Sequence, residues 1–124
     1  MIELFLIALL GTFIVTRIGA HLGNDPYGYG VNDKSKTITA WMRRKTGFDW
    51  HHIHIGLALF LLSIIFIYFR GFTNFNTIFL GAGFSMIIDQ IFPLMKFGDY
   101  FSKKMLIISI LLHITTAVIV FMIF

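Results

Sequence analysis

The sequence predicts an all-α, multi-pass membrane protein in which four transmembrane helices form a bundle. The 124-residue chain is 57% hydrophobic and only 13% charged, whereas soluble domains carry about 25% charged residues. Four apolar stretches also alternate with polar segments, and each is close to the roughly 20 residues that a helix needs to cross the hydrocarbon core. We therefore expect one transmembrane domain, residues 1–124.

The spans are expected at about residues 2–20, 51–69, 75–95 and 104–124, with a loop at about 21–50. An even number of spans places both chain ends on one side of the membrane and this loop on the other. Most basic residues belong to the loop side: Arg17, Lys34, Lys36, Arg43, Arg44, Lys45, Lys96, Lys103 and Lys104. Only Arg70 lies opposite. The positive-inside rule therefore predicts a cytoplasmic loop in a cell-membrane protein, with both termini outside.

Local signals predict where the spans begin and end. Asp49 precedes the second span and is expected to cap the free amides of its first turn. Thr73 or Asn74 is expected to cap the third span. Pro93 is expected to end or kink that span, because proline lacks the amide that a helix interior requires.

The long loop divides into two parts. Residues 21–33 are rich in turn-forming residues and are expected to be irregular. Within Ser35–Lys45, Ile38, Trp41 and Met42 recur at helical spacing among basic residues, which predicts a short interfacial helix with its apolar face on the bilayer. An ordinary solvated linker is the alternative.

Basic residues flank apolar spans here, so the net charge of +4 favours membrane lipids rather than nucleic acid as the partner. A long basic side chain at the end of a span can extend to the headgroups. The candidate headgroup-binding residues are Arg17, Arg43, Arg44 and Lys45.

Histidines gather at the start of the second span, where three of five lie between Trp50 and Gly56. His51 and His54 share one face of a regular helix; a later helix start would instead align His52 with His54. His54 is about four residues inside its span, roughly 6 Å deep. Asp89 is about four residues from the loop-side end of the third span, so the two side chains are expected at the same depth.

Asp89 also belongs to a row of small and polar residues. Gly81, Ser85 and Asp89 recur every four residues, and small residues at this spacing allow helices to pack closely. We therefore expect the carboxylate to face the bundle interior. Ionisable groups inside a span usually mark a pathway, a ligand site or an ion pair.

A metal site is one interpretation of these residues. The chain has no cysteine, which excludes thiolate ligands and disulfides, whereas His and carboxylate ligands suit Zn²⁺, Mn²⁺ or Fe²⁺. The candidate ligands are His51, His54, Asp89 and His21, with His113 as a further option. Asp89 and His54 would then be catalytic residues of a metal-dependent hydrolase or transferase that acts on a lipid or another amphiphile at the cytoplasmic interface. A structural hydrogen bond between His54 and Asp89 is the simpler alternative.

Two other functions use the same residues. Ser109, His113 and Thr116 share one face of the fourth span, and His titrates near neutral pH, so these residues and Asp89 are candidates for the path of a proton- or cation-conducting transporter or channel. The third hypothesis is a structural or assembly subunit whose polar groups only lock the helices. In each case the small chain favours a homo-oligomer.

Overall fold

The computed structural model of the protein describes residues 1–23, 36–95 and 98–123. Within these ranges there are five helices and no strands: α1 Ile2–Gly23, α2 Ile38–Thr46, α3 His52–Arg70, α4 Asn74–Leu94 and α5 Lys103–Ile123. Helices α1, α3, α4 and α5 are long and apolar enough to cross a membrane, which confirms the predicted all-helical class. The irregular segment was predicted at 21–33. Residues 21–23 belong instead to the last turn of α1, and the rest of that segment, together with Lys34 and Lys96, lies outside the described residues.

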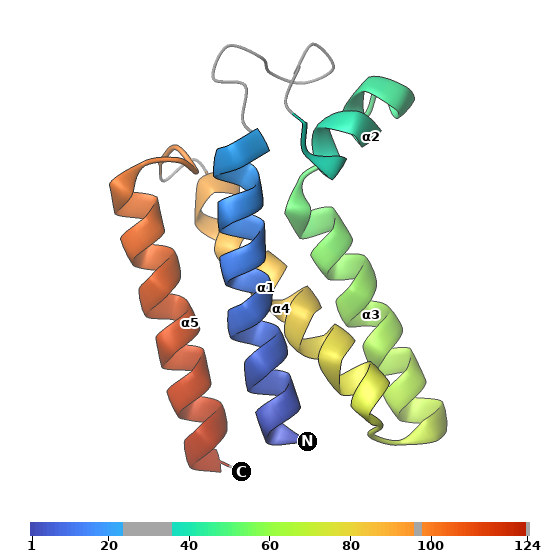
Figure 1. Ribbon diagram of the computed structural model, residues 1–124. Helices are drawn as coiled ribbons and strands as arrows, with labels where there is room; N and C mark the ends of the chain where they lie inside the picture. Colours follow the sequence, from blue (N-terminus) through green and yellow to red (C-terminus); the bar gives the residue numbers. More distant parts are fainter. Residues whose placement is uncertain (24–35, 96–97, 124) are drawn as a thin grey trace.

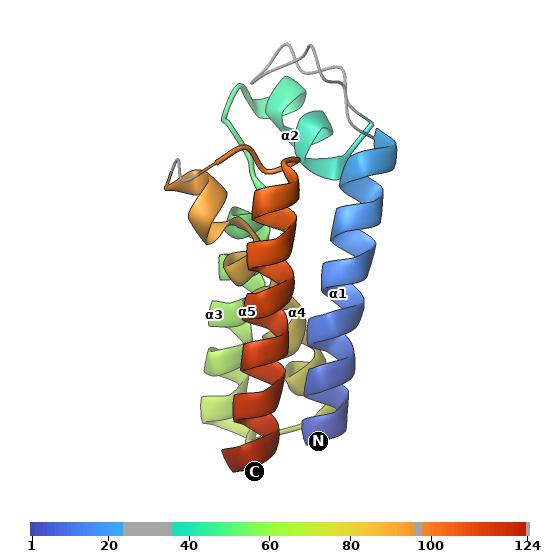
Figure 2. The ribbon, with the colours of Figure 1, turned by 90° about the vertical axis from the view of Figure 1, so that its left-hand side faces the viewer.

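The two chain ends lie at one end of the molecule, and α2 lies at the opposite end (Figures 1 and 2). Helix α4 is the central element, because it packs extensively against both α1 and α3 and more lightly against α5. Figure 1 shows α4 inclined behind α1, between α3 and α5. Residues of α4 therefore reach every other long helix.

Glycines set the close contacts of α4. A Cβ atom on Gly81 would lie 2.6 Å from the carbonyl oxygen of Phe5 on α1, and one on Gly83 would lie 2.7 Å from the carbonyl oxygen of Gly56 on α3. Both distances are too short for a real side chain. The close packing predicted at Gly81 is therefore present against α1, and the second contact, between Gly56 and Gly83, was not predicted.

Helix α3 begins later than expected, which corrects the role given to Asp49. His51 is the N-cap residue, and its backbone N–H donates to Nδ1 of His54 at 3.0 Å. The Asp49 carboxylate instead lies 3.1 Å from Nε2 of His51. The helix starts at His52, and the imidazole of His54, not the carboxylate of Asp49, binds a backbone N–H at its cap.

Helix α4 begins as predicted at Thr73. Its Oγ1 accepts from the Asn76 N–H at 3.3 Å, and Oδ1 of Asn76 accepts from the Thr73 N–H at 2.8 Å, so the two side chains form a reciprocal capping box. Pro93 lies in the last turn of α4, which ends at Leu94. This agrees with the prediction that Pro93 marks the end of the span.

A short helix is present where the loop was predicted to contain one. The side chain of Thr37 caps α2 by accepting from the Ala40 N–H at 3.2 Å, and Gly47, with φ at 71°, ends it in the left-handed conformation. Ile38 and Trp41 are 72% and 55% exposed. The helix therefore presents two large apolar side chains on its outer surface.

The interior of the described chain is mainly polar. More polar than apolar side chains are buried, whereas large apolar side chains are exposed along all four long helices. In a membrane this distribution is expected, because lipid tails solvate the outer surface and polar groups need partners inside. The buried polar side chains are therefore the candidates for a functional site.

Candidate functional site

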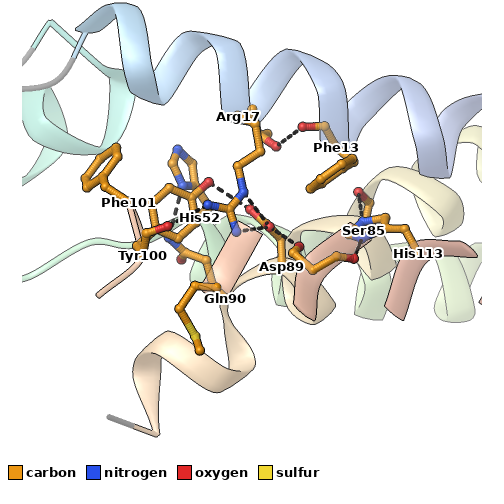
Figure 3. A network of polar contacts seen from close by, with 12 residues as sticks. Phe13, Arg17, His52, Ser85, Asp89, Gln90, Tyr100, Phe101 and His113 are labelled. Carbon is orange, nitrogen blue, oxygen red and sulfur yellow. Dashed lines mark hydrogen bonds and ion pairs between the residues drawn. The ribbon is translucent and has the colours of Figure 1, made fainter. Parts of the chain in front are cut away.

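The Asp89 carboxylate is the centre of a buried polar network (Figure 3). Nε and Nη2 of Arg17 on α1 lie 2.9 and 2.8 Å from Oδ1 of Asp89. The Tyr100 hydroxyl, from the segment before α5, donates to Oδ2 at 2.8 Å, and the Ser109 hydroxyl on α5 donates to Oδ1. Every contact is a donor, so the geometry matches an ionised carboxylate.

Arg17 is held on all sides rather than extended toward headgroups. Its Nη1 donates to the backbone carbonyl of Tyr100 at 2.6 Å, and its guanidinium carbon lies 3.9 Å from the centroid of the Tyr100 ring. The side chain is 6% exposed. Helix α1 continues to Gly23, so Arg17 also lies more than a turn inside the helix instead of at its end.

Tyr100 joins the two charges, and the sequence did not point to it. Burial raises the pKa of its hydroxyl, and the negative charge of Asp89 raises that pKa further. The hydroxyl therefore stays protonated and remains a donor to the carboxylate. Tyr100 lies in a short connection without helical periodicity, so no spacing argument placed it beside Asp89.

His113 lies one turn along α5 from Ser109 and is 1% exposed. Its Nδ1 is 2.8 Å from the Ser109 carbonyl oxygen, its Nε2 is 2.9 Å from Oγ of Ser85, and its ring lies 4.2 Å from that of Phe13. Thr116, predicted on the same face, is half-buried. The predicted polar face of α5 is thus packed inside the molecule at Ser109 and His113.

The contacts of His113 define which of its ring nitrogens carries the hydrogen. A backbone carbonyl can only accept, so Nδ1 carries a hydrogen. In the neutral ring Nε2 is then an acceptor, and the Ser85 hydroxyl donates to it. Ser109 touches both groups, because its hydroxyl donates to Asp89 while its carbonyl accepts from His113.

His52, not His54, is the imidazole of α3 that faces α4. Its Nδ1 is 3.1 Å from Nε2 of Gln90, and its ring centroid is 6.2 Å from that of Tyr100. The side-chain oxygen of Gln90, Oε1, accepts from the Ile53 N–H at 3.0 Å. His52 lies about 100° around the helix axis from Ile53 and about 200° from His54, so the side of α3 that meets Gln90 carries His52 and not His54.

His51 and His54 lie together at the start of α3. Their rings stack with centroids 6.0 Å apart, and the His54 ring is edge-on to Phe48 and Trp50. His21 lies in the last turn of α1 against the Phe101 ring, at 5.4 Å. The predicted metal ligands are therefore divided among three places, and the described part of the chain contains no group of three or more His, Asp or Glu side chains that could hold a metal ion.

The predicted headgroup-binding residues of α2 differ in their burial. Arg43 is buried; its Nη1 donates to the Trp50 carbonyl, and its Nε lies 3.8 Å from Oδ1 of Asp49. Arg44 and Lys45 are exposed. Arg43 thus ties α2 to the start of α3, and the two exposed cations remain the candidates for headgroups.

Comparisons of the chain with protein-family models, with curated proteins and with solved structures gave no match.

Proposed function

We propose that this chain is a multi-pass membrane transporter or channel that conducts protons, with Asp89 as the central proton-binding group and His113 as a second one. The observation that carries the proposal is a buried carboxylate held by donors from α1, from α5 and from the segment between α4 and α5. Ionisable side chains in this position are costly and usually mark a path for ions or protons.

The chemistry of the site suits a proton more than a bulky solute. Asp89 is 2% exposed, and its charge is balanced by Arg17 at 2.8 Å. Proton uptake by the carboxylate removes the attraction between the two side chains and leaves a buried guanidinium without its counter-charge. The neutral and ionised forms of Asp89 therefore favour different packing of α1 against α4, which is what a carrier needs.

His113 extends the polar path deeper into the helices. Ser109 lies between the two titratable side chains, and Ser85 provides a further hydroxyl beyond His113. Both hydroxyls can rotate, so each can change from donor to acceptor as a proton passes. Thr116 continues the same face of α5.

The orientation proposed for the chain places α2 on the cytoplasmic side and both termini outside the cell membrane. The positive-inside rule supports it. Exposed Ile38 and Trp41, beside exposed Arg44 and Lys45, support a position of α2 on the bilayer surface with its cations near anionic headgroups. The small buried core of one chain favours a homo-oligomer.

The metal-dependent enzyme has less support from this geometry. Asp89 is engaged by donors, whereas His54 packs edge-on against Phe48 and Trp50, and His51 stacks on His54. A purely structural subunit remains the competing function, because an ion pair between Arg17 and Asp89 also fastens α1 to α4.

Proton flux separates conduction from a structural role. The purified protein is reconstituted into liposomes, a pH gradient is imposed, and an enclosed pH-sensitive dye reports proton entry. We expect flux above that of empty liposomes, which Asp89→Asn abolishes and His113→Gln reduces. Asp99→Asn is the matched control, because Asp99 is exposed and its Oδ1 accepts from the Phe101 N–H, a bond that asparagine can also make. Folded protein that gives no flux, or an Asp89→Asn variant as active as the parent, contradicts the proposal.

A further inference from the structure

Gln90 makes two hydrogen bonds to the first turn of α3, and together they fix its orientation. The Ile53 N–H is a donor, so the atom 3.0 Å from it must be the Gln90 carbonyl oxygen. The amide nitrogen then faces Nδ1 of His52 at 3.1 Å. Gln90 is buried and follows Asp89 directly in the sequence.

This orientation defines the tautomer of His52. The amide nitrogen of glutamine can only donate, so Nδ1 of His52 must accept, and the neutral ring carries its hydrogen on Nε2. Turning the Gln90 amide over would place two donors face to face at Ile53. Gln90 of α4 therefore caps α3 through the Ile53 N–H and also sets the tautomer of His52.

His52 stands beside the proposed proton path. It is the first residue of α3, at the α2 end of the molecule, and its ring lies 6.2 Å from Tyr100, whose hydroxyl binds Asp89. Four charged or titratable groups act on it: Asp89 on α4, Arg17 on α1, His51 at the cap and Arg43 on α2. The Tyr100 ring also faces it. A relay at this position would connect the loop side of the molecule to the buried site.

We propose that Gln90 is a positioning residue that keeps His52 from relaying protons, by occupying the only acceptor nitrogen of its neutral ring. The inference rests on the proposed proton conduction. An imidazole relays a proton by accepting it on one nitrogen while releasing another from the opposite nitrogen. With Nδ1 bound to Gln90, His52 has a donor but no free acceptor, so protons do not pass through it to the Asp89 site.

Two substitutions separate this role from simple support of the fold. Gln90→Leu removes both hydrogen bonds and frees Nδ1 of His52. In Gln90→Glu, the carboxylate still accepts from the Ile53 N–H, but it cannot donate to the imidazole. His52 then moves its hydrogen to Nδ1 in order to donate to the carboxylate, and Nε2 becomes a free acceptor. The second variant therefore preserves the cap of α3 while reversing the tautomer.

Nitrogen-15 NMR of the histidine rings in liposomes tests the positioning directly, with His52→Gln used to assign the signal. We expect the Nε2–H tautomer in the parent protein and the Nδ1–H tautomer in Gln90→Glu. A parent ring that carries its hydrogen on Nδ1, or that shows the same tautomer in both proteins, overturns the inference.

Proton flux tests the blocking role. We expect Gln90→Leu and Gln90→Glu to conduct several-fold faster than the parent, and His52→Gln added to Gln90→Leu to return the rate to the parent value. Loss of support for the fold predicts slower flux instead, so unchanged or slower flux in folded Gln90→Glu overturns the blocking role. If no variant conducts protons, the proposed function fails, and the NMR result alone decides whether Gln90 positions His52.

Discussion

The ion pair between Arg17 and Asp89 gives the sharpest stability prediction. Both side chains are almost completely buried, at 6% and 1% exposure. Removing one partner leaves the other charge buried without compensation, which costs about 3–5 kcal/mol in comparable pairs. We therefore expect Arg17→Met and Asp89→Leu each to lower the free energy of unfolding by about that amount.

The double variant, with both Arg17→Met and Asp89→Leu, tests this reasoning. When both charges are absent, no uncompensated charge remains, and replacing a buried pair by apolar residues is often close to neutral. The two losses should therefore not add, and we expect a coupling energy of about 3 kcal/mol or more. Unfolding by a denaturing detergent, followed by circular dichroism, measures all four proteins of the cycle.

The pair Arg43 and Asp49 is the matched control. Its Nε to Oδ1 distance is 3.8 Å, and the Asp49 side chain is 64% exposed. Exposed pairs couple by about 0–1 kcal/mol. If the losses at Arg17 and Asp89 simply add, or if their coupling is no larger than that of the control cycle, the reasoning about a compensated buried charge is wrong.

Three further predictions follow from other parts of the molecule. Gly83→Ala places a methyl group 2.7 Å from backbone atoms of α3 and should destabilise the protein by about 1–3 kcal/mol. Gly11→Ala is the control, because nothing lies within 4 Å of its added methyl group. Equal melting temperatures of the two variants in detergent would refute this prediction. The folded-state pKa of Tyr100 is raised above its unfolded value, so its contribution to stability is complete below about pH 10 and declines as the pH rises above that value. The free energy of unfolding, measured against pH, should not show this alkaline decline in Tyr100→Phe. A Tyr100→Phe profile identical to that of the parent would contradict the prediction. Because the chain has no cysteine, the single-cysteine variants Lys45→Cys and Arg70→Cys show on which side of the membrane each position lies. An impermeant thiol reagent added outside intact cells should label only Arg70→Cys. Labelling of Lys45→Cys alone would reverse the proposed orientation.

The helices and the inward direction of Asp89 could be predicted because each rests on a short-range pattern. Apolar stretches of span length predict α1, α3, α4 and α5, and the four-residue spacing of Gly81, Ser85 and Asp89 predicts the packed face of α4. The same kind of spacing placed Ser109 and His113 on one face of α5. These features depend only on helical geometry, which the sequence expresses directly.

The partners of Asp89 could not be predicted, because they depend on where helices begin and end. His52 faces Gln90 of α4, whereas His54, which was predicted to meet Asp89, packs against Phe48 and Trp50. Arg17, which was predicted to extend to the headgroups, is buried against Asp89 and Tyr100. Helix boundaries are uncertain by one or two residues even in known structures, and on a helix one residue changes the face by about a quarter of a turn.

The most direct test of the account is to observe the protonation of Asp89 itself. Infrared difference spectra of the protein in liposomes, recorded as the pH is lowered, should show the carbonyl band of a newly protonated carboxyl group. We predict that this band disappears in Asp89→Asn and remains in Asp99→Asn. A band that survives in Asp89→Asn, or no such band in folded parent protein that conducts protons, would contradict Asp89 as the central proton-binding group.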